Sequence, residues 1–597
     1  MRRTISGFTS ALLAVVALAS AGLAAELPLG LWVWTAEAET AVLDVAVERE
    51  GGSWLATADG DPVSIEVRER QVAIGGHAEG RGFAGELSED GATIRGLWRQ
   101  PSGPLAYADM ATPSVLAAVH EGRWKGRVAL QPRLFRVFLD VFENEDGDLA
   151  AVVRNPERNE IMASRFDMEP DGDGRWMLSA GRGERRVRRS LEETKTGLRL
   201  AHSWFGAPLM LRRAGPEDAA FYYPRDPAAG PARYAPPPGL DDGWTVAAAE
   251  EAGFDRQALD DLVAELAADD PRNARPRLIH SVLAAHKGRL VLEEYFYGYD
   301  RETRHDTRSL AKVFAPVLVG ALQQRGVAIA ADDRPIPELL AAAGETIDDP
   351  RKEKITLAHL MSFSSGLDCD VVRNSPGSED RMWSQRAESD FWLYTARLPL
   401  LHDPGTRYAY CSGSINLVGS RLKAAGGAPI LDLFDDLIAR PLQFGPYHWN
   451  LAPNGAAYLG GGAYMRPRDI LKVGAMFAAG GRWKGAQIVD PDWVEKSTTA
   501  VIDITPQTTG LSPEDFNNNY FGGSAAYEWR IDEVRAGEKT YASYEATGNG
   551  GQILLVVPDL ELVVLFTGGN YRQGGVWGRW RNEIVGGHII PAMTSGR

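Results

Sequence analysis

The sequence is poor in the residues that build metal sites. Its 597 residues include 10 histidines and 2 cysteines. Because the histidines are scattered without the spacing of metal ligands, no metal site and no cofactor is predicted, and a structural role is expected for each histidine. The histidines weighed in this way are His305, His359, His402, His448 and His588.

Long apolar runs are missing outside the N-terminus. Residues 1–25 carry Arg2 and Arg3, an apolar run from Ala11 to Ala19, and then small residues. This order is typical of a secretory signal peptide, and its apolar part is too short to span a bilayer. The chain is therefore predicted to be exported to the periplasm or the extracellular space, by the general secretory route rather than the twin-arginine route, with no transmembrane segment.

Positive charge is also in deficit. The formal net charge is −16 and becomes −18 once Arg2 and Arg3 leave with the signal peptide. Such a surface repels nucleic acid and anionic lipid, so nucleic acid is excluded as an expected partner. The oligomeric state is left open.

The two cysteines are expected to form a disulfide in an exported chain. In an oxidising compartment a lone pair usually forms one disulfide, here between Cys369 and Cys411. Two buried free thiols are the alternative.

The length exceeds what one hydrophobic core supports, so several domains are expected. Residues 26–215 alternate short apolar strands with turn signals, which predicts an all-β region. Within it Gly30-Leu31-Trp32 recurs as Gly122-Arg123-Trp124. This repeat predicts two small antiparallel barrels or sandwiches, at 26–115 and 116–215, with one larger β-domain as the alternative. A Pro- and Gly-rich stretch at 216–245 predicts a linker, and 246–597 forms the last domain.

The last domain is organised around Ser309 and Lys312. An amphipathic helix at 255–266 and a hairpin at 279–296 are predicted before this segment. If a helix begins near Ser309, the spacing of three places its hydroxyl and the Lys312 amine on one face, which is the geometry of a nucleophile and its base. A lysine takes up a proton only where its amine is kept neutral, and the apolar segment after Lys312 could supply that environment. Taken alone, the pair fits a helix cap followed by a surface lysine better than a catalytic site.

Several later motifs follow in a specific order. After the Ser309 segment come Ser364-Ser365-Gly366-Leu367, the segment from Pro404 to Tyr410, and Gly460-Gly461-Gly462-Ala463-Tyr464. With the hairpin, residues 250–590 resemble the β-lactamase-related serine hydrolases, which include class C β-lactamases, D-alanyl-D-alanine peptidases, family VIII esterases and 6-aminohexanoate-dimer hydrolase. The resemblance implies an α/β fold: an antiparallel sheet flanked by helices, an all-α subdomain, and an active site between the two.

The resemblance also implies roles for individual residues. In this family the Ser of S-x-x-K attacks a carbonyl, and the Lys and a later Tyr transfer protons. Ser309, Lys312 and Tyr410 match these positions, with Tyr408 as the competing tyrosine. The Lys312 ammonium is expected to bias Tyr410 towards phenolate. Ser412 stands where the family has Asn.

The third family motif is Lys-Thr-Gly or His-x-Gly, and it is altered here. The chain reads Ala546-Thr547-Gly548, followed by Asn549, so the cation is missing. Backbone N–H groups of Ser309 and Asn549 are expected to form the oxyanion hole. Without the cation, uncharged esters or amides are expected to be better substrates than anionic β-lactams, unless an arginine such as Arg530 or Arg572 compensates. The residues expected to line the site are Ser412, Ala546, Gly548 and Gly551.

Together these observations predict an exported serine hydrolase of the carboxylesterase or amidase type. It would cleave a small-molecule ester or amide through an acyl-enzyme on Ser309. Two alternatives remain: a non-catalytic cell-envelope binding protein with a degenerate hydrolase fold, and a D,D-peptidase or β-lactamase.

Overall fold

A computed structural model describes residues 27–36, 42–75, 82–101, 108–131, 135–158, 165–172, 174–181, 186–201 and 207–594. The predicted signal peptide lies outside these residues. The chain forms two compact units. One contains the described residues up to Trp32 with Leu139–Val152 and Arg165–Arg213, and the other contains Val33–Phe138, Val153–Ser164 and the chain from Ala214 onwards. The domain boundaries predicted from the sequence stay predictions.

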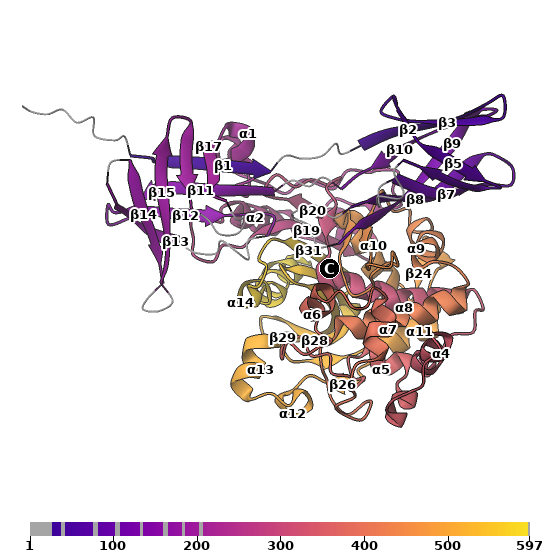
Figure 1. Ribbon diagram of the computed structural model, residues 1–597. Coiled ribbons are helices and arrows are strands. Elements are labelled where there is room, and N and C mark those ends of the chain that lie inside the picture. The colour runs from indigo at the N-terminus through magenta and orange to yellow at the C-terminus, as the bar shows by residue number, and fades with distance from the viewer. Residues whose placement is uncertain are drawn as a thin grey trace, which may run out of the picture. The chain divides into compact units, whose positions relative to one another are not determined.

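A closed antiparallel barrel accounts for much of the N-terminal β region (Figure 1). Apolar side chains such as Phe166 and Met168 are buried and alternate with exposed Arg165 and Asp167, as expected for strands with one face on a core. Trp32, from the repeat motif, is buried and donates its indole N–H to the Pro28 carbonyl at 2.9 Å. The barrel strands, in spatial order, are β1 Gly30–Ala36, β11 Phe135–Glu143, β12 Leu149–Arg154, β13 Arg165–Pro170, β14 Arg175–Ala180, β15 Val187–Thr194, β16 Gly197–Leu200 and β17 Leu209–Arg213.

A second antiparallel sheet uses the strands between β1 and β11. The second tryptophan of the repeat, Trp124, is buried there and stacks on Trp54 with ring centroids 5.6 Å apart. The predicted all-β character of the N-terminal region is thus confirmed. The strands, in spatial order, are β4 Asp61–Val63, β3 Ser53–Ala58, β2 Val42–Glu50, β10 Arg123–Ala129, β9 Met110–His120, β8 Thr93–Gln100, β7 Gly82–Leu87, β6 Gln71–Ile74 and β5 Ile65–Arg68.

This second sheet continues into the C-terminal part of the chain. Ala111 of β9 pairs with Trp449 of β22 (His448–Asn450), and β22 pairs with β23 (Ala463–Met465). In turn β23 pairs with β21 (His305–Asp306), which ends three residues before Ser309. Both parts belong to the same compact unit. The N-terminal sheet therefore extends by hydrogen bonds to the strand that leads into the Ser309 segment.

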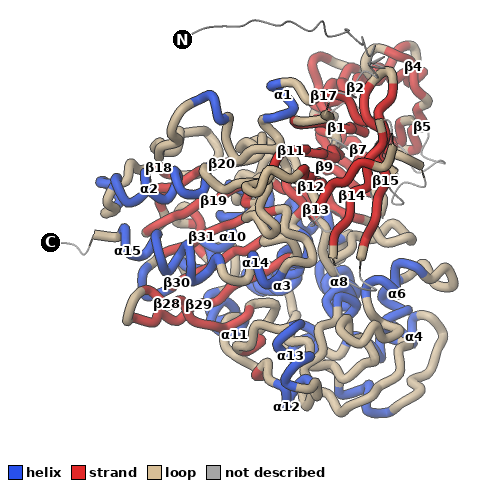
Figure 2. Tube along the Cα trace, turned by 90° about the vertical axis from the view of Figure 1, so that its left-hand side faces the viewer, coloured by secondary structure: helices blue, strands red, loops and turns tan. Residues whose placement is uncertain are grey.

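The largest sheet of the C-terminal part has helices on both of its faces (Figure 2). Along β31, Val564 and Phe566 pack in one apolar cluster, and the intervening Val563 and Leu565 pack in another. Continuous apolar strands are expected where helices cover both faces. The predicted hairpin is confirmed as β19 and β20. The strands, in spatial order, are β18 Thr245–Val246, β20 Arg289–Tyr295, β19 Ile279–His286, β31 Leu562–Gly568, β30 Gln552–Val557, β29 Lys539–Gly548, β28 Arg530–Ala536, β27 Ser524–Ala525 and β26 Ile502–Asp503, and β24 Arg482–Trp483 pairs separately with β25 Ala486–Gln487.

Helices supply the layers on either side of this sheet. The amphipathic helix predicted at 255–266 is confirmed as α2, which begins after the cap residue Asp255. The α-helices are α1 Pro216–Ala219, α2 Arg256–Ala267, α3 Phe314–Gln324, α4 Pro335–Ala342, α5 Leu357–Met361, α6 Glu379–Ser384, α7 Phe391–Ala396, α8 Ser412–Gly426, α9 Ile430–Phe434, α10 Pro467–Ala478, α11 Pro491–Ser497, α12 Pro506–Thr509, α13 Pro513–Asn519, α14 Gly574–Trp577 and α15 Ile590–Ala592. Short 3₁₀ segments are η3 Pro227–Ala229, η4 Glu250–Ala252, η5 Arg308–Val313, η6 Pro350–Lys354 and η8 Pro558–Leu560, and π-helical segments are η7 Asp435–Ala439 and η9 Arg581–Ile589.

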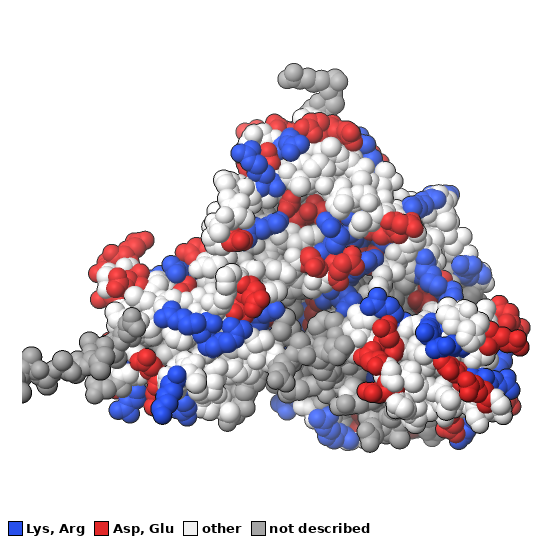
Figure 3. Space-filling view, turned by 90° about the horizontal axis from the view of Figure 1, so that it is seen from above, with Lys and Arg blue, Asp and Glu red and all other residues white. Residues whose placement is uncertain are grey.

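Within the described residues no helix is both long and apolar enough to cross a membrane. On the face seen from above, lysines and arginines are interspersed with aspartates and glutamates (Figure 3). Interspersed charges of both signs on this face differ from the continuous basic stripe that a polyanion-binding surface needs.

Candidate active site

Ser309 and Lys312 lie on a 3₁₀ segment, η5, instead of on the α-helix expected from the sequence. In a 3₁₀-helix, side chains three residues apart eclipse each other, so this geometry aligns the pair more closely than an α-helix would. The Lys312 ammonium donates to the Ser309 Oγ at 2.8 Å. Lys312 is buried and Ser309 is half-buried. The α-helix α3 starts only at Phe314, so Pro316 lies in its first turn, where a missing N–H is tolerated.

Backbone contacts fix the start of η5. The Thr307 N–H and hydroxyl both donate to the Ala463 carbonyl, at 2.9 and 2.7 Å. The Gly462 N–H donates to the Arg308 carbonyl at 3.1 Å. On the other side, a Cβ on Gly548 would collide with the Thr307 carbonyl, so β29 approaches η5 at backbone distance. The Gly-rich segment and the third motif thus meet at Ser309.

Tyr410 is the tyrosine that lies against Lys312. The Lys312 Nζ is 5.1 Å from the centroid of the Tyr410 ring. The competing Tyr408 is buried, with its ring against Phe363 and Tyr520 at centroid distances of 5.9 and 5.6 Å. Tyr410 immediately precedes Cys411, the N-cap residue of α8. The position of its backbone therefore depends on how α8 begins.

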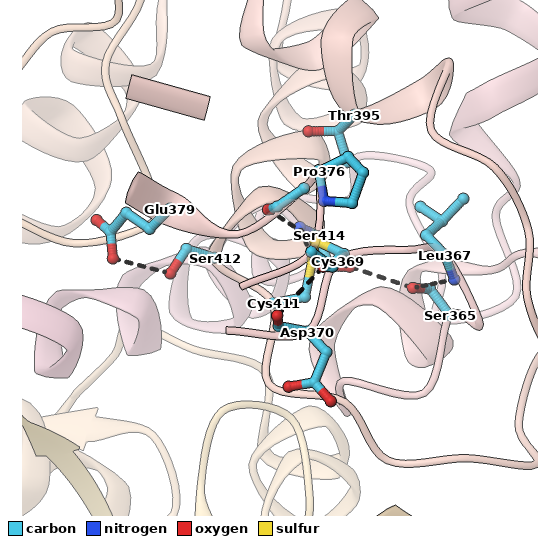
Figure 4. Close-up of a disulfide and its surroundings, with 12 residues drawn as sticks. Ser365, Leu367, Cys369, Asp370, Pro376, Glu379, Thr395, Cys411, Ser412 and Ser414 are labelled. Atoms are coloured by element: carbon cyan, nitrogen blue, oxygen red, sulfur yellow. Dashed lines mark hydrogen bonds between the residues drawn. A yellow bond between two sulfur atoms is a disulfide. The ribbon is translucent and has the colours of Figure 1, made fainter. Parts of the chain in front are cut away.

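The predicted pairing of Cys369 with Cys411 is present as a disulfide, with the Cα atoms 5.2 Å apart (Figure 4). Both cysteines are buried. The Val371 N–H donates to the Tyr410 carbonyl at 3.1 Å, next to the bridge. The bridge and this hydrogen bond together fix the loop that carries Tyr410.

The charges around Lys312 differ from the sequence-based expectation. Burial lowers the pKa of Lys312, but Tyr410 and two carboxylates, Glu379 and Glu528, raise it by more, so the net shift is upward. For Tyr410, burial and Glu528 raise the pKa by more than Lys312 lowers it. The raised pKa of Lys312 contradicts the predicted neutral amine. The predicted bias of Tyr410 towards phenolate is present, but burial and Glu528 outweigh it. Both upward shifts of the pKa favour an ammonium next to a neutral phenol in the resting site.

Sequence reasoning missed the two carboxylates. The Ser412 hydroxyl donates to Glu379 at 3.2 Å (Figure 4). The Tyr458 hydroxyl donates to the same carboxylate at 3.2 Å. Ser412 thus binds an acidic residue close to Lys312. Glu528 lies in the turn before β28 with a φ of +64°, and burial raises its pKa well above the ordinary value. In the sequence, the one sign of a carboxylate here was Ser412, which stands where the family has Asn. The shorter side chain leaves room for an acidic partner such as Glu379.

The altered third motif lies on β29 next to η5. Ala546 is buried and points to the same strand face as Gly548, two residues on. Asn549 follows, and its side-chain oxygen accepts the Arg572 N–H at 2.7 Å. A Cβ on Gly551, whose φ is +99°, would collide with the Trp580 ring. The motif therefore presents a methyl group and backbone where the family has a cation.

Arg530, named as a substitute for the missing cation, already pairs with carboxylates. It pairs with Glu545, and its other guanidinium nitrogen lies 3.5 Å from Asp532. Its charge is thus compensated within β28 and β29. Among the residues that the structure describes, no three His, Cys, Asp or Glu side chains gather in a way that could hold a metal ion.

The model of the Beta-lactamase family matches residues 256–573 of the sequence, more than half of the chain. The chain belongs to the β-lactamase family. This assignment confirms the resemblance found in the motifs and the predicted fold of the C-terminal part.

Solved structures similar to this β-lactamase-family chain include three hydrolases. A Bacillus anthracis protein described as a 6-aminohexanoate-dimer hydrolase is 17% identical, with 53% of this chain and 81% of that chain covered and a TM-score of 0.42. EstCE1, a hydrolase with promiscuous acyltransferase activity, is 16% identical, with 53% and 94% covered and a TM-score of 0.39. A family VIII carboxylesterase is 16% identical, with 49% of this chain and 86% of that chain covered and a TM-score of 0.37. No curated protein matches the chain.

Proposed function

We propose that the protein is an exported serine hydrolase that cleaves an ester or amide through an acyl-enzyme on Ser309. The observation that carries this proposal is the 2.8 Å hydrogen bond between Lys312 Nζ and Ser309 Oγ, with Tyr410 against the same ammonium. A nucleophile within hydrogen-bond reach of a group that can take its proton is the signature of covalent catalysis.

The proposed reaction has two halves. Ser309 Oγ attacks the substrate carbonyl while its proton passes to the Lys312–Tyr410 pair, and the pair then protonates the leaving group. Backbone N–H groups of Ser309 and Asn549 stabilise the oxyanion. Water then attacks the acyl-enzyme with the same groups acting in reverse, which releases the acid and restores Ser309.

The active form of the pair has one proton less than the resting form. An ammonium next to a neutral phenol cannot accept the Ser309 proton, so one of the two must first lose a proton. Because the two groups lie together in a buried site, this proton belongs to the pair rather than to either residue. Ser309 is thus activated only in the fraction of molecules in which the pair has lost it.

The substrate is proposed to be uncharged. The strand position of the family cation is held by the buried Ala546, and Arg530 is paired with Glu545. The site therefore offers a substrate carboxylate less attraction than a family site with Lys would, and the negative net charge of the protein acts in the same direction. This favours an esterase or amidase over a β-lactamase or D,D-peptidase.

Labelling with a fluorophosphonate probe tests the nucleophile directly. The mature protein should react at Ser309, and Ser309→Ala should abolish labelling, whereas Ser53→Ala, at an exposed strand position, should not. Labelling that persists in Ser309→Ala would reject the proposal. Export is tested separately by the N-terminal sequence of protein from the periplasm or medium, which should begin near residue 26.

A further inference from the structure

A cavity of about 540 Å³ lies beside the Ser309 segment and plays no part in the chemistry described above. One wall comes from the part of the chain that matches the family, including Tyr299, Asp306, Tyr464 and Tyr571. The facing wall comes from residues that precede that part, including Phe135, Arg136, Pro156, Arg158 and Phe221. All of these residues belong to one compact unit. The N-terminal β region thus contributes to a cavity next to the nucleophile.

Short contacts connect the cavity to the proposed active site. The Arg308 N–H donates to Asp306 Oδ1 at 2.9 Å, and the Arg308 guanidinium lies 5.1 Å from the centroid of the Tyr571 ring. The Tyr571 ring also contacts the third-motif loop, because a Cβ on Gly550 would lie 2.9 Å from it. Arg308 is the residue before Ser309. Two lining residues therefore contact the segments that hold the nucleophile and the oxyanion hole.

Most of the charged groups in the cavity wall are already paired. The exception is Arg304, which donates to the Leu130 carbonyl at 2.9 Å and whose pKa is lowered by burial. Burial lowers the pKa of the lining His305 to about 4, so this imidazole is neutral at physiological pH. The carboxylates of the wall all have partners within the protein. The pairs are Arg136–Glu157 at 3.1 Å, Arg158–Asp306 at 3.7 Å and Arg466–Glu302 at 3.2 Å, and Asp300 accepts the backbone N–H groups of Glu302 and Thr303 at 3.0 and 2.8 Å. A charged ligand would have to compete with these pairs or, at Arg304, with the Leu130 carbonyl.

The rest of the wall suits an uncharged ring. Phe135, Phe221, Tyr299, Tyr464 and Tyr571 present aromatic surface to the cavity, and aromatic rings pack well on one another in stacked or edge-to-face arrangements. The volume lies within the range of pockets that hold drug-sized molecules, so an acetyl group would leave most of it empty.

We propose that this cavity is a subsite that binds an uncharged aromatic ring system of the ester or amide cleaved at Ser309. The proposal rests on the hydrolase function proposed above and adds the class of substrate to it. It also gives the N-terminal β region a function, because that region supplies one wall. The ring belongs either to the acyl group or to the leaving group of the substrate.

Two substitutions in the lining are designed to block the cavity. Val42 lines it from the first residue of β2 and is 36% exposed, and Thr303 lines it from the loop before β21 and is half-buried. Val42→Trp and Thr303→Trp should each place an indole in the cavity. Val119→Trp is the matched control, because Val119 is 54% exposed on β9 and lies outside the cavity lining.

The kinetic test compares a bulky ester with a small ester in each variant. The acyl arm uses p-nitrophenyl 2-naphthoate, and the leaving-group arm uses 2-naphthyl acetate. For each of these esters, kcat/KM is divided by kcat/KM for p-nitrophenyl acetate in the same variant. In at least one arm this ratio should fall about tenfold or more in Val42→Trp and Thr303→Trp, and stay unchanged in Val119→Trp. The arm that responds identifies the side of the scissile bond that carries the ring. Ratios that stay unchanged in both arms would overturn the proposal.

A binding test separates the cavity from catalysis. In the Ser309→Ala background, 2-naphthol should bind with a Kd that rises at least about tenfold on adding Val42→Trp and stays constant on adding Val119→Trp. If the wild type shows no Ser309-dependent hydrolysis but 2-naphthol binds in this way, the proposed function fails and the cavity remains a ring-binding site. If hydrolysis depends on Ser309 but Val42→Trp leaves the Kd of 2-naphthol unchanged, the cavity proposal fails and the proposed function stands.

Discussion

Removal of the Cys369–Cys411 bridge should destabilise the C-terminal part by a predictable amount. The bridge spans 42 residues of sequence, and closing such a loop removes about 13 cal/mol/K of entropy from the unfolded chain, or about 4 kcal/mol at 25 °C. Because the chain has two compact units, global unfolding signals would mix their transitions. Loss of esterase activity in guanidinium chloride follows the relevant unit alone. With a slope of about 5 kcal/mol/M, the midpoint in Cys369→Ala/Cys411→Ala should fall by about 0.8 M.

The control for this measurement is the wild type unfolded in the presence of a thiol reductant. Once reduced, the wild type has the same unfolded chain as the double variant, so any remaining difference between the two measures the packing of the buried sulfur atoms. Activity before unfolding should also fall in the double variant, because the bridge lies next to Tyr410. A wild-type midpoint that reductant leaves unchanged would refute the loop-entropy reasoning. Two alkylatable thiols in the unreduced protein would refute the bridge itself.

Three further predictions concern activity. Ser309→Ala and Lys312→Ala should each remove nearly all hydrolysis of p-nitrophenyl butyrate without unfolding the protein, because the catalytic residues act as a unit. Tyr410→Phe should be nearly as damaging. Wild-type turnover in Ser309→Ala would contradict this prediction. The kcat/KM should rise with pH through the alkaline range, because the active form has lost a proton from two groups whose pKa values are both raised. Glu379→Gln should move the profile to lower pH by removing a charge that raises the pKa of Lys312; a profile that stays in place or moves to higher pH would contradict this. Nitrocefin should be cleaved with a kcat/KM at least about tenfold below that of p-nitrophenyl butyrate, since the charge-assisted contact of the family cation is missing; an equal or higher value would indicate a β-lactamase.

Local sequence patterns were sufficient for the elements around Ser309. The β19–β20 hairpin follows from its apolar runs and the Lys287-Gly288 turn, and α2 follows from its periodicity and the Asp255 cap. The spacing of Ser309 and Lys312 correctly placed the two side chains together, although on a 3₁₀ segment. That segment depends on tertiary contacts with Ala463 and Gly548, which no local pattern encodes.

The protonation states were mispredicted for a related reason. The apolar run after Lys312 does bury the ammonium, and burial alone lowers its pKa as expected. The opposing effect comes from Glu379 and Glu528, which lie 67 and 216 positions further along the chain. A carboxylate in a sequence gives no sign of which lysine it will face after folding. The sign of the net pKa shift is thus a property of the tertiary structure.

The hydrogen-bonded path from the N-terminal sheet to Ser309 gives the β region a structural reason to be part of this chain. Each strand on the path, β9, β22, β23 and β21, has its backbone groups satisfied by the next, and Trp449 of β22 is fully buried. Without β9, the outer edge of β22 would present unpaired N–H and C=O groups. The short β21 and β23 carry the backbone that positions Thr307, and Thr307 in turn positions η5 through Ala463. A β region that merely carried a separate binding function would need no such continuity, whereas one that completed the proposed substrate site would have to be held in register with Ser309.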